Sequence, residues 1–473
     1  MTDEALLLAP LTEQAEALRT RGISAVELTQ AYLQRIERLN PKVLAYITVS
    51  SDLALAQARA ADAEIASGCY RGPLHGVPVG VKDQLFTKGL RTTGGSALLR
   101  DFLPDYDATV ITKLQQAGAV LLGKQNMEEF ALRGTRNHPY GDPRNPWDLT
   151  RIAGHSSSGS GAALAAGLCA AAVGEDTGGS IRNPGNVCNL VGLRPTFGRV
   201  SRHGLLQGSW SMDQASPIGR TAEDCALMLQ AIAGHDPADA LSSAQPTPDY
   251  RAGLQAGIRG LRLGVIRELK LDGSADPDVR AAVEGAIAAL QGLGASVEEI
   301  SLPLINLAGP LFVAIADTDA AAVHYQRLRE HPEGFDQGTR SRLLAASLLP
   351  AGLYARAQRA RTLLRNQMVQ ALGRFDAVIS PMSARPALTL EEEAAPMATK
   401  EEVLRRQFAS RNYTTPFALA GLPAASIPCG FSRDRLPIGF QVGAGPFAEA
   451  TILRIAAAYQ TVTDWHTQRA PLN

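Results

Sequence analysis

Short apolar strands alternate with helical segments along most of this chain, and the alternation limits the folds that the chain can adopt. Valines recur at every second position in GVPVGVKD (76–83), which is the pattern of a strand. The stretch 108–126, ATVITKLQQAGAVLLGKQN, is typical of a helix, a glycine turn and a buried strand. Farther along, LRLGVIRE and ASVEEISL flank a helix that begins at Asp276-Pro277. Repeated strand–helix–strand units favour a sheet that is covered by helices.

The sequence contains no boundary between separate folding units. No Pro/Ser-rich linker and no repeat of fixed period interrupts the 473 residues. We therefore predict the α/β class, with a single α/β/α layered domain (1–473) whose large mixed β-sheet is covered by helices on both faces. Within it we expect a helical layer at about 10–65, a core at about 66–235, a more variable substrate-side region at about 236–375, and C-terminal strands and a helix at about 376–473.

Composition argues against several classes of protein. Lys+Arg and Asp+Glu are both 46, so the formal net charge is zero, and neither a nucleic-acid partner nor a membrane-surface partner is indicated. The five cysteines are scattered without a CxxC pair, which argues against a disulfide framework and a zinc knuckle. No signal-peptide pattern is present, and AALAAGLCAAAVG is too short and too broken by glycine to span a bilayer. We expect a cytoplasmic protein without a metal or cofactor.

One charged residue stands at the end of an apolar strand. Lys82 closes the run of valines, and burying an ammonium group without a partner costs several kcal/mol. In one interpretation the lysine pairs with Asp83 or is simply solvated. In the other, burial or a hydrogen bond keeps the amine neutral, so that it can act as a base.

Two serine- and glycine-rich loops are the second unusual feature. GHSSSGSG (154–161) leads directly into a helix of small residues, and EDTGGS (175–180) follows a short buried strand. A double glycine can aim several backbone N–H groups at one point, which suits a phosphate or a developing oxyanion. Each loop alone could also be a capped helix start or a plain turn. His155 lies inside the first loop, and single histidines are mostly structural.

Five stretches in this order together resemble the amidase signature family, serine hydrolases that use a Ser-Ser-Lys triad. They are GVPVGVKD, RNPWDLTRIAGHSSSGSGAALAAG, EDTGGSIRNPG, VGLRPTFGRVSRHG and NYTTPFALAGLPAASIPCG. The resemblance runs from about residue 10 to 470. It implies the layered α/β/α fold and the catalytic roles of specific residues.

The resemblance implies a proton path through three residues. The lysine of the family's strand is Lys82, the nucleophile after the double glycine is Ser180, and the bridging serine, 24 positions earlier in the chain, is Ser156. Neutral Lys82 would take a proton from Ser156, which relays it from Ser180 as that residue attacks an amide carbonyl.

The resemblance also implies the groups around this triad. Backbone N–H groups of the second loop would hold the oxyanion: those of Thr177, Gly178, Gly179 and Ser180. Three side chains would support the loops: Ser157, Asp176 and Arg182. In the family a glycine precedes the bridging serine, across a cis peptide bond; this chain has His155 there.

For the substrate, the resemblance gives different indications at two positions. The carboxyl-terminal part is similar to the A subunit of glutamyl-tRNA amidotransferases, in which an aspartate binds the α-ammonium of glutamine. Counting back from the TTP motif places Arg411 at that position, and an arginine would instead suit a carboxylate or a neutral acyl group. The arginine for the α-carboxylate would correspond to Arg361. Met127 and Phe130 are also predicted to contact substrate.

The leading hypothesis is thus a hydrolase of a small amide, carbamate, urea or hydrazide. The alternative is the glutamine-hydrolysing A subunit of an amidotransferase. The non-enzyme alternatives are a nucleotide-binding protein and an inactive scaffold within a complex, and the sequence has neither GxxxxGK[ST] nor GxGxxG. The expected partner is a small amide-type molecule, without nucleic acid or membrane, and a homodimer remains open.

Overall fold

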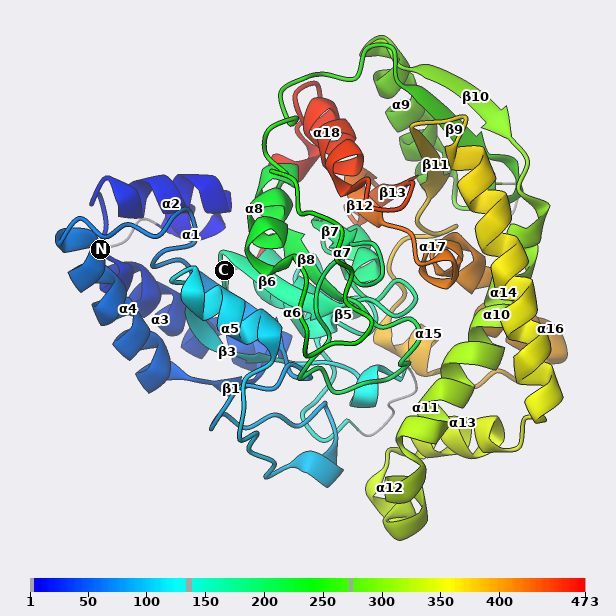
Figure 1. Ribbon diagram of the computed structural model, residues 1–473, viewed down its shortest axis with the longest axis horizontal. Helices are drawn as coiled ribbons and strands as arrows, with labels where there is room; N and C mark the ends of the chain where they lie inside the picture. The colour runs from blue at the N-terminus through cyan, green and yellow to red at the C-terminus, as the bar shows by residue number, and fades with distance from the viewer. Residues whose placement is uncertain (1–3, 133–137, 272–274, 473) are drawn as a thin grey trace.

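The computed structural model describes residues 4–132, 138–271 and 275–472, and one large sheet runs through it (Figure 1). The sheet has eleven strands: β1 (Tyr46–Val49), β2 (Pro78–Lys82), β3 (Val120–Gln125), β6 (Ala171–Glu175), β7 (Val191–Arg194), β8 (Ala215–Gly219), β9 (Arg262–Ile266), β10 (Ser296–Ile300), β11 (Ala377–Pro381), β12 (Ala424–Phe431) and β13 (Pro437–Ala444). Their order is β1-β3-β2-β6-β8-β7-β12-β13-β11-β9-β10, with parallel and antiparallel neighbours. The predicted large mixed sheet is confirmed.

Helices lie against both faces of this sheet (Figure 1). Those of the first half of the chain are α1 (Glu4–Leu8), α2 (Leu11–Arg19), α3 (Ala25–Val43), α4 (Ser51–Ala66), α5 (Thr109–Gln116), α6 (Ser158–Ala165), α7 (Arg182–Val187) and α8 (Ala222–Ile232). Those of the second half are α9 (Pro277–Gly292), α10 (Ala308–Phe312), α11 (Thr318–Val323), α12 (Tyr325–Glu330), α13 (Gln337–Ser347), α14 (Ala351–Leu372), α15 (Leu390–Ala394), α16 (Lys400–Val403), α17 (Thr415–Ala420) and α18 (Glu449–Gln460).

Strand β2 lies between β3 and β6 and is parallel to both. Val79 is opposite Leu121 on one side and Ala171 on the other, and all residues of the three strands are buried. Because parallel strands end at the same edge of a sheet, the carboxyl ends of β2 and β6 bring Lys82 and Glu175 together. This edge carries the candidate active site.

The position of helix α6 explains why its sequence consists of small residues. It packs against β2, β6 and α7, and its residues 158–164 are buried. A Cβ atom at Gly159 would lie 2.3 Å from the backbone oxygen of Asn126, and one at Gly161 would lie 2.9 Å from the side chain of Pro184. Glycine therefore permits the close approach that seats the serine loop on the sheet edge.

Two local expectations differ from the structure. The predicted helical layer at 10–65 includes β1, which pairs antiparallel with β3 at the edge of the sheet. Its four residues, YITV, are too few for a periodic pattern, and strand pairing decides their conformation. The small-residue helix, which the sequence predicts at 159–169, ends at Ala165, because Gly167 adopts a φ of 69° and turns the chain toward β6.

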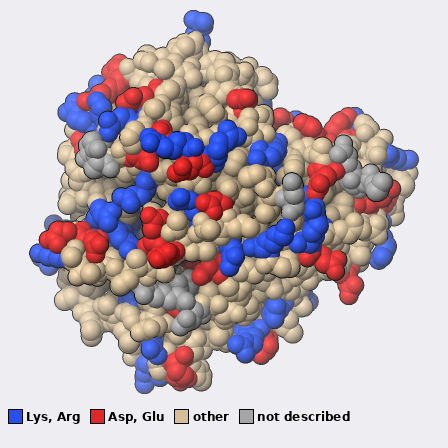
Figure 2. All heavy atoms as spheres, turned by 180° about the vertical axis from the view of Figure 1, so that it is seen from behind, with Lys and Arg blue, Asp and Glu red and all other residues tan. Residues whose placement is uncertain are grey.

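The charges on the surface and the burial of one apolar segment bear on the expectation that the protein has no membrane partner. Basic and acidic side chains are interspersed on the face shown in Figure 2. The segment Pro303–Val323 is long and apolar enough to cross a membrane, but 56% of its most apolar window is buried inside the protein. Such burial is typical of an apolar helix that packs into the core of a protein.

We expect Phe440 to be a major contributor to stability. Its ring, on β13, is fully buried and packs edge-to-face on Tyr459 of α18, with ring centroids 5.1 Å apart. Phe440→Ala should lower the free energy of unfolding by about 3–5 kcal/mol, measured by denaturant unfolding. Leu348→Ala, at a side chain that is 83% exposed, should change it by less than about 0.5 kcal/mol. Equal effects of the two substitutions would contradict this packing.

Candidate active site

The structure brings Lys82 and Ser156 into contact at the edge of the sheet. The Lys82 ammonium nitrogen, Nζ, lies 2.7 Å from Ser156 Oγ and 3.1 Å from Glu175 Oε2. Lys82 and Glu175 are wholly buried. Asp83, the other partner considered for this lysine, instead accepts a 2.9 Å hydrogen bond from the backbone N–H of Thr93. Lys82 is therefore a buried, hydrogen-bonded lysine and not a solvated one.

Ser157 ties the first loop to the second. Its backbone N–H donates to the carbonyl oxygen of Ser180 at 3.2 Å, and its hydroxyl donates to the carbonyl oxygen of Glu175 at 3.0 Å. The peptide bond between His155 and Ser156 is cis. Ser180 remains partly exposed and lines a pocket. Ser157, predicted as a supporting residue, thus makes two hydrogen bonds to the second loop.

The double glycine of the second loop is required by its surroundings. Gly179 has a φ of 125°, which side-chain-bearing residues rarely adopt, and a Cβ there would lie 2.6 Å from Thr414 Oγ1. A Cβ on Gly178 would lie 2.4 Å from the ring of Phe312. The hydroxyl of Thr414 donates to the carbonyl oxygen of Gly178 at 2.6 Å. Only glycine lets the later segments approach this loop so closely.

The backbone N–H groups of this loop are not equivalent. That of Gly179 donates to Asp176 Oδ1 at 2.8 Å. Within the described part of the chain, the N–H groups of Thr177, Gly178 and Ser180 have no hydrogen-bond acceptor. All of these residues line the pocket. Three of the four predicted oxyanion donors are therefore available to a ligand, and the fourth holds the loop in shape.

A buried ion triad fixes the second loop. The Asp176 carboxylate accepts two 3.0 Å hydrogen bonds from Arg182 and lies 3.1 Å from a guanidinium nitrogen of Arg194, and all three side chains are wholly buried. Burial alone would raise the pKa of Asp176, but the two guanidinium groups hold it far below its ordinary value. The predicted pairing of Asp176 with Arg182 is present, and Arg194 is a partner that we did not predict.

Three neighbouring polar groups were also not predicted. The hydroxyl of Thr177 lies 2.6 Å from Glu175 Oε1 and 2.8 Å from Asp213 Oδ1, and both carboxyls are wholly buried. A signal was available for Glu175, because two apolar strands that end in Lys82 and Glu175 would bring opposite charges together if they paired in parallel. Asp213 comes from a distant turn, and no local pattern marks it.

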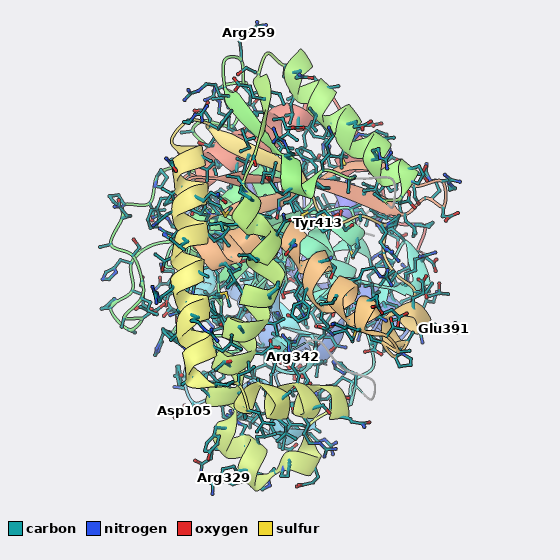
Figure 3. All side chains as sticks on the ribbon, turned by 90° about the vertical axis from the view of Figure 1, so that its right-hand side faces the viewer. Asp105, Arg259, Arg329, Arg342, Glu391 and Tyr413 are labelled. Carbon is teal, nitrogen blue, oxygen red and sulfur yellow. The ribbon has the colours of Figure 1, made fainter. Side chains whose placement is uncertain are left out.

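The pocket beside Ser180 has a volume of about 590 Å³. Segments from both halves of the chain line it, and Figure 3 shows Arg342 on α13 and Tyr413, two of its lining residues, on the side formed by the later segments. Its charged and titratable lining residues, among those that the structure describes, are Glu128, His155, Arg342, Arg385, Glu392, Arg405, Arg406 and Arg411. Arginine therefore dominates the charge of the pocket wall.

The predicted residue Arg411 lies in this wall. Its guanidinium carbon stands 5.2 Å from the centroid of the Phe312 ring, and its Nε donates to the carbonyl oxygen of Gln407 at 2.8 Å. Arg342, which we did not predict, forms an ion pair with Asp317. It lies in a helical region without a recognisable motif, so only the fold brings it to the pocket.

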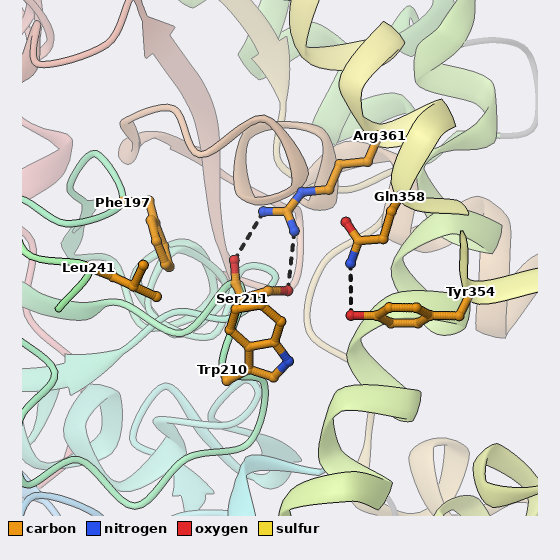
Figure 4. A pocket seen from close by; sticks show the side chains of 7 residues that line it. All are labelled: Phe197, Trp210, Ser211, Leu241, Tyr354, Gln358 and Arg361. Atoms are coloured by element: carbon orange, nitrogen blue, oxygen red, sulfur yellow. Dashed lines mark hydrogen bonds between the residues drawn. The ribbon is translucent and has the colours of Figure 1, made fainter. Parts of the chain in front are cut away.

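Arg361 is not part of this pocket. It lines a separate hollow of about 400 Å³ (Figure 4), where its guanidinium donates to the carbonyl oxygen of Leu419 at 2.7 Å and to the oxygens of Ser211 at 3.0 and 3.2 Å. The resemblance assigns Arg361 from the local sequence of helix α14, and its side chain lies in the separate hollow. The structure therefore does not bring Arg361 and Ser180 together.

Met127 and Phe130 do not reach the pocket either. Both side chains are buried. The centroid of the Phe130 ring lies 4.3 Å from that of the His324 ring and 5.7 Å from that of the Phe335 ring. The backbone reverses at Phe130, which has a φ of 51°. Other residues of this segment face the pocket instead: Glu128, Ala131 and Leu132.

Comparison with known proteins identifies the family. A family model described as Amidase matches residues 27–453, which is most of the chain. The chain belongs to the amidase family. Within the described residues, no group of three or more His, Cys, Asp or Glu side chains is arranged to hold a metal ion. The chain is therefore an amidase-family hydrolase of C–N bonds.

Relatives of this amidase have more than one substrate. The chain is 43% identical to the A subunit of a glutamyl-tRNA(Gln) amidotransferase of Geobacter metallireducens, over 97% of this chain and 98% of that protein. The crystal structure of the corresponding Thermotoga maritima protein is 32% identical, with a TM-score of 0.80 over 97% and 95% of the two chains. The structure of a 6-aminohexanoate cyclic dimer hydrolase is 28% identical, with a TM-score of 0.87 over 99% and 100%.

The buried triad predicts a large stability effect. Asp176→Asn should lower the free energy of unfolding by about 3–5 kcal/mol, because it leaves Arg182 and Arg194 buried without a counter-charge. Since the folded-state pKa of Asp176 is depressed, its contribution is present above the ordinary carboxyl pKa and is lost only as the pH falls through the lowered value. Denaturant unfolding from pH 8 to pH 4 should therefore show the difference throughout.

The matched control is Asp101→Asn, at an exposed carboxylate. It should change the free energy of unfolding by less than about 0.5 kcal/mol. An Asp176→Asn protein as stable as the Asp101→Asn protein would show that the triad contributes nothing.

Proposed function

We propose that this amidase hydrolyses the C–N bond of a small amide through an acyl-enzyme intermediate on Ser180. The observation that supports this most directly is the 2.7 Å hydrogen bond between buried Lys82 and Ser156, at the edge of a pocket that Ser180 lines. A buried amine that is hydrogen-bonded to a hydroxyl can serve as a base, as the family resemblance implies.

In the proposed reaction, neutral Lys82 removes the proton of Ser156, and Ser156 removes the proton of Ser180. The Ser180 oxygen attacks the carbonyl carbon as it loses this proton. The tetrahedral oxyanion is stabilised by the N–H groups of Thr177, Gly178 and Ser180, which have no acceptor among the described residues. The proton then returns to the leaving nitrogen, the C–N bond breaks, and water hydrolyses the acyl-enzyme.

The charge of the pocket supports an acyl group that carries a carboxylate. Five of the described lining residues are arginines and two are glutamates. Glu128 contacts His155 Nδ1, and Glu392 accepts a 2.8 Å hydrogen bond from the backbone N–H of Thr389. Arg342 is paired with Asp317, and four further arginines still outnumber the two glutamates. An anionic acyl group would meet complementary charge, whereas an ammonium group would meet repulsion near Arg411.

Glutamine hydrolysis within an amidotransferase is the second candidate. The 43% identity to the A subunit of a glutamyl-tRNA(Gln) amidotransferase, over nearly the whole of both chains, favours it. As the A subunit of an amidotransferase, the protein would work with partner subunits. A carbamate, urea or hydrazide remains an alternative to the simple amide, and an inactive scaffold or a nucleotide-binding protein would contradict both candidates. The cytoplasmic location, the single-domain organisation and the homodimer stay predictions.

The nucleophile is tested by covalent labelling. Ser180→Ala should abolish labelling by a fluorophosphonate and lower amide hydrolysis by about 10³-fold or more, because no other group can carry the acyl chain. The control is Ser160→Ala, on helix α6 close by, whose buried hydroxyl has no hydrogen-bond partner among the described residues. It should be labelled like the wild type. Equal labelling of the Ser180→Ala protein would refute the assignment.

The substrate is tested by a matched pair of amides. Glutaramate is glutamine without its α-ammonium, so kcat/KM should be at least about tenfold higher for glutaramate if Arg411 repels the ammonium. Arg411→Asp should raise the ratio of glutamine to glutaramate hydrolysis by about tenfold or more, and Arg411→Gln should give an intermediate ratio. Efficient wild-type hydrolysis of glutamine, with a ratio that these substitutions do not change, would favour the amidotransferase candidate.

A further inference from the structure

A chain of buried polar groups continues from Lys82 away from the serines. Lys82 Nζ lies 3.1 Å from Glu175 Oε2, and Glu175 Oε1 lies 2.6 Å from the hydroxyl oxygen of Thr177. The same hydroxyl oxygen lies 2.8 Å from Asp213 Oδ1. Lys82, Glu175 and Asp213 are wholly buried, and Thr177 is 8% exposed. The three oxygen-bearing side chains therefore form a hydrogen-bonded series shielded from water.

Counting protons constrains this series. A threonine hydroxyl has one hydrogen to donate, and an ionised carboxylate can only accept. Thr177 can thus donate to one of the two carboxyls, and the other contact is a hydrogen bond only if that carboxyl itself carries a proton. If both carboxyls were unprotonated, the hydroxyl oxygen of Thr177 would face one of the two carboxylate oxygens at a buried site with no hydrogen between them. The arrangement therefore requires that Glu175 and Asp213 share one proton.

Two backbone N–H groups stabilise an ionised Asp213 when Glu175 holds the shared proton. The Asp213 carboxylate accepts hydrogen bonds from the backbone N–H of Gly208 at 2.7 Å and from that of Ser209 at 2.9 Å. Burial and the neighbouring Glu175 carboxyl act in the opposite sense and raise the pKa of Asp213 to about 7.

Resting on the proposed function, we propose that Glu175 is a positioning residue that controls the charge of Lys82 through a proton shared with Asp213 across Thr177. When Glu175 holds the proton, it carries no charge that would keep Lys82 protonated, and the lysine is the neutral base. As Lys82 receives the proton of Ser156, Glu175 passes its own proton to Thr177, whose hydroxyl proton moves to Asp213. The new ammonium then faces a carboxylate.

No proton is gained or lost in this step. The O–H bonds of Ser180, Ser156, Glu175 and Thr177 break, and new bonds form from hydrogen to Ser156 Oγ, Lys82 Nζ, Thr177 Oγ1 and Asp213 Oδ1. The bond from Ser180 Oγ to the acyl carbon forms at the same time, the π bond of the carbonyl breaks, and its electron pair becomes the oxyanion. The positive charge that appears on the lysine is matched by the negative charge that moves from Asp213 to Glu175, which stabilises it in a dry environment.

The other charged groups at this end of the sheet are engaged elsewhere. Asp176 is held between Arg182 and Arg194. Asp319, next to the Ser209 turn, accepts hydrogen bonds from three hydroxyl groups: those of Ser209, Ser211 and Tyr354. Among the described residues, Glu175 is therefore the carboxyl in direct contact with Lys82.

The first test follows the rate of Ser180 labelling by a fluorophosphonate between pH 5 and pH 10, in the full-length protein. Glu175→Gln keeps the shape of the side chain but cannot become charged. Its maximal labelling rate should fall by about tenfold or more, because the lysine loses its counter-charge during attack. The rise of the rate should also move to lower pH by about one unit or more, since no carboxylate favours the protonated lysine.

The second test uses two substitutions at Thr177 that leave its backbone N–H in place. Thr177→Ser keeps the bridging hydroxyl, and Thr177→Val keeps the shape but removes the hydroxyl. The valine protein should be labelled about tenfold or more slowly than the serine protein, because the proton can no longer pass between the carboxyls. This comparison holds even if Glu175→Gln does not fold, which thermal unfolding reports.

The outcomes separate the two proposals. A wild-type chain that no fluorophosphonate labels would overturn the proposed function, and this inference with it. A labelled wild type whose pH profile is unchanged in Glu175→Gln would overturn the inference alone, and so would equal rates in the two Thr177 proteins. A purely structural Glu175 would lower stability without moving the pH profile.

Discussion

The Asp176 carboxylate, held between two buried arginines, is the interaction on which the rest of the site depends. It accepts a hydrogen bond from the backbone of Gly179 and so shapes the loop that presents Ser180. Arg182 also donates to the carbonyl oxygen of Thr414 and to the side chain of Gln441, and it thereby joins that loop to α17 and β13. Segments more than 200 residues apart are fixed around one charge. A buried charge is tolerated only when its partners are all in place, so the three side chains act as a unit.

Much of the fold, and the contact between Lys82 and Ser156, could be predicted from the sequence because their signals are local. Alternating valines mark β2, and the spacing of two serine loops relative to Lys82 is itself the family pattern. Short strands such as β1, β7 and β8 have too few residues for periodicity, and pairing within the sheet decides them. Arg361 is assigned from a resemblance of local sequence, and local sequence does not show which side of a helix faces the pocket.

The residues that were not predicted share one property: each becomes relevant only through a contact with a distant part of the chain. Arg342 and Asp213 lie in segments without a recognisable motif. Glu175 precedes the loop that carries the motif, and its role depends on the pairing of β2 with β6. A single sequence contains no direct information on such pairings. The buried polar groups around Lys82 therefore needed the three-dimensional structure.

The proposed reacting groups and the arginines of the pocket wall come from different stretches of the chain, which has a consequence for how such a protein can change. Lys82, Ser156 and Ser180 come from the first 180 residues, whereas every arginine of the described pocket wall lies between 342 and 411. Mutations in the later segment can thus alter the preferred acyl group without disturbing proton transfer. Evolution by gradual drift, and laboratory selection from libraries confined to 342–411, would both explore new substrates on an unchanged reaction. The proposed chemistry and the arginines of the pocket wall are in this way encoded in separate stretches of one gene.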